Sequence, residues 1–173
     1  METPDSAAGL PAHDPIDLRQ AFSKFGTGVT VITARSCDGV SVGVTANSFN
    51  TVSLNPPIVL WSLSCDSPSL NVFRDAGHFA VNVLSLGQIE LSRRFSRPSA
   101  NKFAGLSLAS AACGVPLLPD CAAVIECKTL SAQTVGDHVL FLGQVTRYEY
   151  ANKPPLLFLH GTYVQPIALE SIR

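Results

Sequence analysis

The sequence has little charge and no excess of either sign. Only 14% of its 173 residues are charged, and the formal net charge is −1. A nucleic-acid-binding domain normally presents a broad cationic face, so this class is disfavoured and any bound phosphate must be held locally. With 46% hydrophobic residues and a mean hydropathy of +0.26, a monomer of this size would expose much apolar area. We therefore expect a homo-oligomer.

The sequence also lacks the spacings of metal sites and disulfide frameworks. Its cysteine count is odd, no CxxC pair occurs, and the four histidines are scattered, so we expect no metal and no disulfide framework. No apolar run is long enough to span a membrane, and the N-terminus has no basic start before an apolar block. These features predict a cytoplasmic protein in a reducing compartment. The cysteines are Cys37, Cys65, Cys113, Cys121 and Cys127.

No internal repeat or interdomain linker interrupts the chain. Residues 1–14 are rich in proline, alanine and acidic residues, which predicts a disordered N-terminal tail. Residues 15–173 are long enough for one continuous core. We expect this segment to form a single domain.

Strand-like runs outnumber helical ones. An amphipathic helix is expected at 14–25, with further helices at 67–77 and 86–95 after a capping-box pattern. Turn signals separate the other runs, which are rich in β-branched residues. This pattern favours a mainly β fold, a small antiparallel barrel with a few peripheral helices. A doubly wound parallel sheet is disfavoured, because no helix separates the first three strands. The expected strands are 29–35, 40–46, 48–54, 58–64, 78–84, a 122–150 hairpin turning at 135–137, and 156–164.

One glycine pair imitates a nucleotide-binding fingerprint. Gly26-Thr27-Gly28 matches the start of GxGxxG, but the third glycine position holds Val31. The motif also precedes a strand, whereas the fingerprint must follow one and open a helix. We therefore read it as a flexible hinge.

The stretch GVTANSFNTVSLNPP, residues 43–57, carries no charge. Small side chains at Thr45, Ala46, Asn47 and Ser48 would let a flat ligand lie against the backbone and would offer it neutral hydrogen bonds. Gly43 removes a side chain where a ligand or another strand comes close. A half-exposed sheet with a Ser- and Thr-rich outer face explains the same composition, so both interpretations stay open.

Six motifs occur in an order that resembles the flavin reductase family, small flavin-binding split barrels of which many serve two-component monooxygenases. The resemblance covers roughly residues 18–163. The motifs are GVTVIT, GVTANSFNTVSLNPPIVLWSLS, FAVNVLS, KFAG, GDH and PLLFLHGTY.

The resemblance implies a homodimer that binds FMN or FAD and reduces it with NADH or NADPH. His138, in GDH, would lie near the nicotinamide or the flavin edge. One of Arg93 and Arg94, with Arg94 preferred, or Lys102 would reach the flavin phosphate. Many relatives have an arginine at His160, which puts a contact there in doubt. The cofactor-binding positions implied by the family are Thr45, Ala46, Asn47, Ser48, Ser62, Leu63, Ser64, Ser67, Asn82, Val83, Leu84, Ser85, Arg94 and Tyr163.

The expected activity is that of an NAD(P)H:flavin oxidoreductase that supplies reduced flavin to a partner monooxygenase. One alternative is a non-catalytic flavin- or haem-binding carrier or sensor with the same pocket. A second is an oxidase of vitamin B6 phosphates on a related barrel, which would need a denser set of basic residues than the 12 lysines and arginines present.

Overall fold

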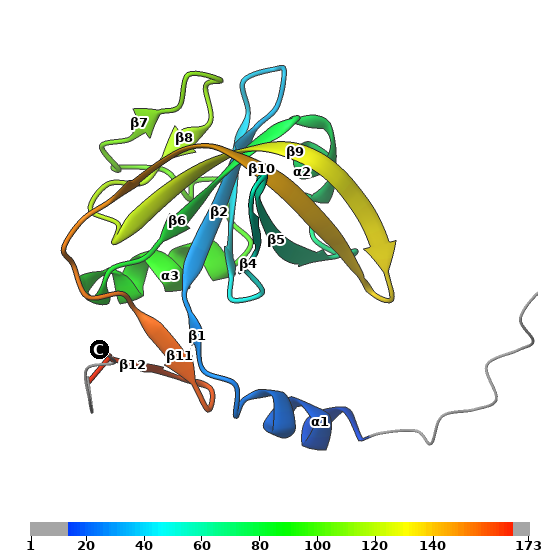
Figure 1. Cartoon of the computed structure of the whole chain (residues 1–173), viewed down its shortest axis with the longest axis vertical. Coiled ribbons are helices and arrows are strands. Elements are labelled where there is room, and N and C mark those ends of the chain that lie inside the picture. Colours follow the sequence, from blue (N-terminus) through cyan, green and yellow to red (C-terminus); the bar gives the residue numbers. More distant parts are fainter. Residues whose placement is uncertain (1–13, 168–173) are drawn as a thin grey trace, which may run out of the picture.

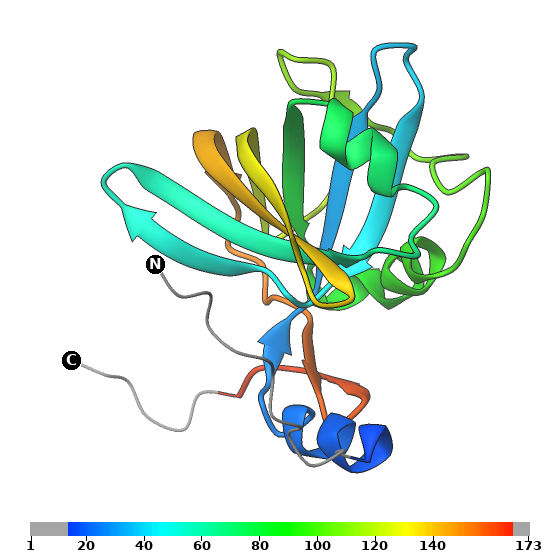
Figure 2. The same cartoon turned by 90° about the vertical axis from the view of Figure 1, so that its right-hand side faces the viewer.

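A curved seven-stranded antiparallel sheet dominates the computed structural model, which describes residues 14–167. Its strand order is β3-β2-β6-β9-β10-β5-β4, and both views show it strongly twisted and curled (Figures 1 and 2). The fold is therefore mainly β and antiparallel, as predicted. The strands are β2 (Thr30–Arg35), β3 (Ser41–Ala46), β4 (Asn50–Leu54), β5 (Pro57–Ser64), β6 (His78–Val83), β9 (Ala123–Val135) and β10 (His138–Tyr150).

A hydroxyl joins two strands that are not neighbours in the sheet order. Ser48, just after β3, accepts a hydrogen bond at Oγ from the Ser62 N–H and donates one to the Ser62 carbonyl oxygen, both at 3.0 Å. The curl of the sheet thus brings the end of β3 beside β5.

An aromatic cluster fills the interior of the sheet. Trp61 is fully buried, stacks on Phe141 with ring centroids 4.6 Å apart, and meets Phe73 edge-on at 4.9 Å. Gly143 permits this packing on β10, because a Cβ there would lie 2.3 Å from Cζ of Phe79. Trp61 therefore belongs to the core.

Two helices cover the sheet where predicted. α2 (Leu70–Asp75) buries Leu70 and Phe73. α3 (Ile89–Ser96) follows a 3₁₀ turn, and its Phe95 side chain is 1% exposed. α3 can lie close to β3 because Gly43 has no side chain: a Cβ there would be 2.5 Å from Cε1 of Phe95.

The two ends of the described chain form a separate arm, seen below the main sheet in Figure 2. Helix α1 (Pro15–Phe22) is capped by Asp14 and precedes β1 (Thr27–Gly28), which pairs with β11 (Leu157–Leu159). β12 (Thr162–Val164) completes a three-stranded sheet.

The arm corrects two expectations. The predicted hinge at Gly26-Thr27-Gly28 contains a short strand. The predicted final strand is a hairpin, because His160 and Gly161 adopt positive φ angles of 50° and 75° and reverse the chain.

The segment 97–122 is irregular apart from the short strands β7 (Ala109–Ser110) and β8 (Pro116–Leu117). The predicted tail at 1–14 lies almost entirely outside the described residues. Within residues 14–167, no helix combines the length and apolar character needed to cross a membrane.

Candidate functional site

A recess of about 210 Å³ lies between β3, the loop after β5 and the end of α3. We call it the α3 recess. Thr45, Ser67, Ser69 and Ser96 supply its hydroxyls, Leu63 adds apolar surface, and Arg97 and Lys102 supply its positive charge. It therefore combines small polar walls with two cations.

Hydrogen bonds hold α3 against this wall. The Thr45 hydroxyl donates to the Ser92 carbonyl oxygen at 2.7 Å. The buried Ser92 hydroxyl in turn lies 3.0 Å from the Tyr163 hydroxyl on β12. The helix is thus bonded both to β3 and to the arm.

Lys102 lines the recess and is partly buried. Its Nζ donates to the carbonyl oxygens of Gly43 and Phe95, both at 3.0 Å, and burial lowers the pKa of its ammonium group. No carboxylate among the described residues forms an ion pair with Lys102 or with the exposed Arg97. Their charge is available to an anion.

The turn of the β9–β10 hairpin places His138 beside the predicted wall. His138 is directly opposite Ser64 in the β10–β5 ladder. Its Nδ1 lies 2.7 Å from Oδ1 of Asp137. This hydrogen bond, with the charge of the imidazole, lowers the pKa of the Asp137 carboxyl.

Residues 22–166 match the family model of the flavin reductase like domain. The chain belongs to this family. It is 41% identical over 146 residues to the FMN reductase (NADH) SmoA of Agrobacterium fabrum, covering 84% of this chain and 83% of that protein. It is 39% identical over 150 residues to the reductase component of the flavin-dependent trigonelline monooxygenase of Acinetobacter baylyi, covering 87% of this chain and 48% of that protein.

The fold agrees with this family. The Streptomyces globisporus NADH:FAD oxidoreductase, solved with NAD and FAD fragments, superposes with a TM-score of 0.85 at 33% identity, over 92% of this chain and 96% of that one. The chain spans about half the length of two of the curated relatives that it matches.

The structure brings together one part of the family's expected flavin wall. Thr45, Leu63 and Ser67 all line the α3 recess. Ser48 and Ser62 meet through their hydrogen bonds beside it, and Ser64 adjoins His138. Strands that are distant in sequence thus converge beside this recess.

Other expected positions are placed differently. Asn82 and Leu84 have no exposed surface, and the Asn82 amide is used inside the fold, where it donates to the Val31 carbonyl and accepts from the Leu118 N–H. Neither side chain can contact a ligand in this arrangement. Val83 is partly buried and Ser85 almost fully buried.

Four further positions are used elsewhere in the fold, lie in a different recess or are buried in the core. Arg94 donates to the Ala104 carbonyl oxygen at 3.0 Å and does not line the α3 recess. The Tyr163 hydroxyl meets Ser92. Asn47 lines a different recess, of about 280 Å³, together with Phe25 and His160 of the arm, while Ala46 is buried in the core.

Sequence reasoning missed Arg97. It follows α3 in an irregular stretch, where no periodicity indicates the direction of a side chain. Lys102 was one of several basic candidates, and only the structure separates it from Arg93 and Arg94.

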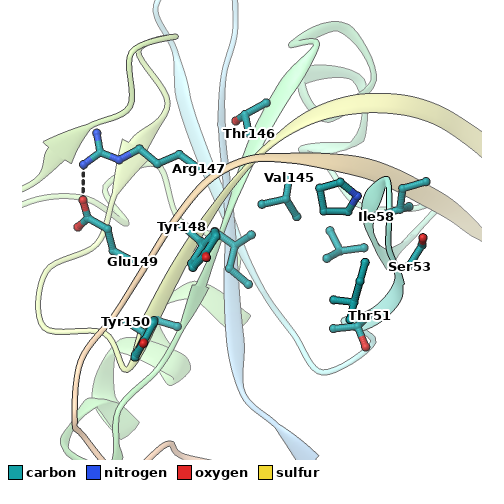
Figure 3. Close-up of a pocket in the computed structure, with 14 residues that line it drawn as sticks. Thr51, Ser53, Ile58, Val145, Thr146, Arg147, Tyr148, Glu149 and Tyr150 are labelled. Carbon is teal, nitrogen blue, oxygen red and sulfur yellow. Dashed lines mark hydrogen bonds and ion pairs between the residues drawn. The ribbon is translucent and has the colours of Figure 1, made fainter.

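A larger groove, of about 810 Å³, lies on another face, between β4, β5, β9 and β10 (Figure 3). We call it the apolar groove, since Leu54, Ile58, Ile125 and Val145 line it together with two tyrosines, Tyr148 and Tyr150. Its arginine, Arg147, is neutralised by Glu149 and by Glu126, which is 3.9 Å away. Within residues 14–167, no cluster of three or more acidic, histidine or cysteine side chains could hold a metal.

Proposed function

We propose that this protein is an NAD(P)H:flavin oxidoreductase, which transfers a hydride from NADH or NADPH to FMN or FAD and supplies the reduced flavin to a partner monooxygenase. The observation that carries the proposal is the convergence of Thr45, Leu63 and Ser67 on a recess whose two cations have no acidic partner. Relatives named as NADH-dependent FMN reductases and as monooxygenase reductase components support it.

A bound flavin supplies the redox chemistry, so this chain's residues need only bind and orient the reactants. The small side chains of Thr45 and Ser67 leave room for a planar ring in the α3 recess, and backbone N–H groups near Ser48 are available to its polar edge. His138 lies at the rim of the same wall, next to Ser64. There it can hydrogen-bond the nicotinamide carboxamide or move a proton.

The activity is tested by steady-state oxidation of NADH and of NADPH with increasing free FMN or FAD. A rate that depends on free flavin is the expected result. His138→Ala should lower kcat while leaving flavin affinity close to the wild-type value. The paired variant Asp137→Asn, which keeps the imidazole, should have a smaller effect.

The alternative function is a flavin- or haem-binding carrier or sensor. It requires the same recess but a nicotinamide face that is closed. A tightly bound flavin that both NADH and NADPH leave oxidised would favour this alternative and refute the reductase.

We further propose that the protein is a single-domain homodimer of the cytoplasm. The apolar groove would be the interface, since its aliphatic side chains and tyrosine rings form a large surface that is costly to leave in water. All five cysteines are free, three of them exposed, which suits a reducing compartment. Sedimentation equilibrium of the full chain tests the dimer.

A further inference from the structure

Three aromatic rings surround a recess in the arm that shares no lining residue with the α3 recess. We call it the arm recess. It has a volume of about 280 Å³, and Phe22, Phe25 and Phe158 line it. The Phe22 and Phe25 side chains are 67% and 74% exposed. Because burial of apolar surface is favourable, rings this exposed offer binding energy to another molecule.

Two basic side chains, Arg19 and His160, line one end of the arm recess. Both also line a neighbouring recess that contains no aromatic ring, so the basic end lies where the two recesses meet, with the rings to one side of it. No acidic residue of the described chain lines either recess. Within residues 14–167, no carboxylate forms an ion pair with Arg19 or His160. Their donors are therefore open to an anion.

Backbone hydrogen bonds hold these side chains on one frame. The Ser23 N–H donates to the Arg19 carbonyl oxygen at 2.9 Å, and the His160 N–H donates to the Ser23 carbonyl oxygen at 3.0 Å. Phe158 on β11 meets Tyr163 on β12 edge-on, with ring centroids 5.4 Å apart. The end of α1 is thus bonded to the turn of the β11–β12 hairpin. Rings and basic groups are held together before any ligand binds, which lowers the cost of binding.

We propose that the arm recess binds a small aromatic carboxylate, a single ring bearing one acidic group. The ring packs against Phe22, Phe25 and Phe158, since aromatic rings attract one another in offset and edge-on contacts. The carboxylate accepts hydrogen bonds from Arg19, whose planar fork of N–H groups matches two oxygens, and from the His160 ring. At about 30 Å³ per water molecule, the recess holds the equivalent of about nine waters. This space suits one ring and is too small for a flavin.

The carboxylate site goes beyond the proposed reductase activity and does not rest on it. Asn47 is the one position of the expected flavin wall that lines the arm recess. Its neighbour Ser48 bonds instead to Ser62, beside the α3 recess. Adjacent residues of this loop thus serve different surroundings. We therefore expect saturation with FMN to change the affinity for the carboxylate by less than about threefold, below the usual coupling between linked sites.

Isothermal titration calorimetry of the full chain tests the site with three probes at constant ionic strength. Benzoate carries both a ring and a charge, benzyl alcohol carries only the ring, and acetate carries only the charge. We expect benzoate to bind with a dissociation constant of about 1 mM or below. It should bind at least about tenfold more tightly than either of the other probes, because only benzoate uses both ends of the recess.

Three variants complete the design. Arg19→Met removes the charge of an exposed side chain and should lower the affinity for benzoate to about that of benzyl alcohol. Phe25→Ala removes a ring that lies outside the core, so it tests the site even if Arg19→Met unfolds, and it should weaken benzoate severalfold. Lys24→Met is the matched control, because Lys24 is an exposed cation of the same segment that lines neither recess. It should bind benzoate as the wild type does.

The proposal is overturned if benzoate binds no more tightly than acetate, or if Lys24→Met weakens it as much as Arg19→Met does. Loss of benzoate binding in the FMN-saturated protein would also overturn it and would assign the recess to the cofactor site. If the wild type bound no benzoate at all, the exposed rings would be left to a protein surface. NADH oxidation with FMN decides the reductase separately: an active enzyme that does not bind benzoate loses only this site, and an inactive protein that binds benzoate keeps it.

Discussion

The α3 recess and the apolar groove differ in how their charges are balanced. The groove is about four times larger, 810 against 210 Å³, yet its Arg147 is paired with Glu126 and Glu149. In the recess, Lys102 and Arg97 bond only to carbonyl oxygens or face solvent. The positive charge in the larger cavity is thus neutralised by carboxylates, whereas the positive charge in the smaller one is not.

This difference is the reason for proposing different classes of partner for the two surfaces. Unneutralised cations beside hydroxyls bind a small anion, whereas a broad apolar surface with paired charges suits another protein surface. Cavity volume alone would have selected the groove as the cofactor site. Charge balance selects the recess.

The largest effects are expected at Gly43 and Gly143, the two glycines whose missing side chains leave room for an aromatic ring. Gly43→Ala and Gly143→Ala place a Cβ 2.5 Å from Phe95 and 2.3 Å from Phe79, and each should destabilise the fold by about 1–3 kcal/mol through overpacking. Only Gly43→Ala should also weaken FMN binding severalfold, because α3 must move away from β3. Thermal unfolding and FMN titration measure both effects.

Gly87→Ala is the control for this pair, since nothing lies within 4 Å of the added Cβ. If Gly143→Ala weakened FMN binding as much as Gly43→Ala does, the flavin site would extend beyond the α3 recess, and the two glycines would no longer differ in function.

A charge in the apolar groove should dissociate the proposed dimer. Leu54 is 92% exposed in the single chain, so Leu54→Glu costs the monomer little but leaves an unpaired carboxylate in a buried interface. We expect the dimer dissociation constant to rise at least about tenfold, which corresponds to about 1.4 kcal/mol. Sedimentation velocity over a concentration series measures it.

Val40→Glu is the matched control, because Val40 is also exposed and apolar but lies in the β2–β3 turn. An unchanged dimer in the Leu54→Glu variant would remove the groove as the interface.

The pH dependence of FMN binding should follow Lys102. Burial lowers the pKa of its ammonium group. As pH rises, Lys102 therefore loses its charge at a lower pH than an ordinary lysine, whose pKa is about 10.4. Above neutral pH the phosphate is already dianionic, and Arg97, the other charged group lining the recess, stays protonated. The affinity ratio of FMN to riboflavin should therefore fall as pH rises through this lowered pKa.

Titration of the shared isoalloxazine ring cancels in this ratio. In Lys102→Met the ratio should be flat over the same range. A wild-type ratio that stays constant up to the usual lysine pKa would contradict a charged Lys102 at the phosphate.

The smallest effect is expected at the paired arginine. Arg147→Gln removes the exposed ion pair with Glu149, which contributes less than about 1 kcal/mol, and the longer contact with the partly buried Glu126; it should leave the FMN dissociation constant unchanged. Urea unfolding and FMN titration measure the two values. If this variant lost FMN affinity as Lys102→Met does, the phosphate would lie in the groove.

Local signals in the sequence predicted much of the fold. The turn residues Gly136 and Asp137 lie between two long alternating runs, and the structure has the β9–β10 hairpin there. The helical spacing of Leu70 and Phe73 correctly predicted α2 and its buried face. The prediction for the arm was wrong in part, because Thr27 and Gly28 have no strand pattern of their own and pair only with the distant β11.

The sequence by itself determined the strand-rich fold, the family, and the small, uncharged wall around Thr45, because these depend on side-chain size and spacing along short segments. Only the tertiary structure decided that Lys102 and Arg97 share a recess while Arg94 bonds to a carbonyl oxygen and Asn82 is buried. Those outcomes depend on how α3 packs against β3 and on an irregular loop with no periodicity. Neither the packing of α3 nor the path of that loop can be read from the residue types at these positions.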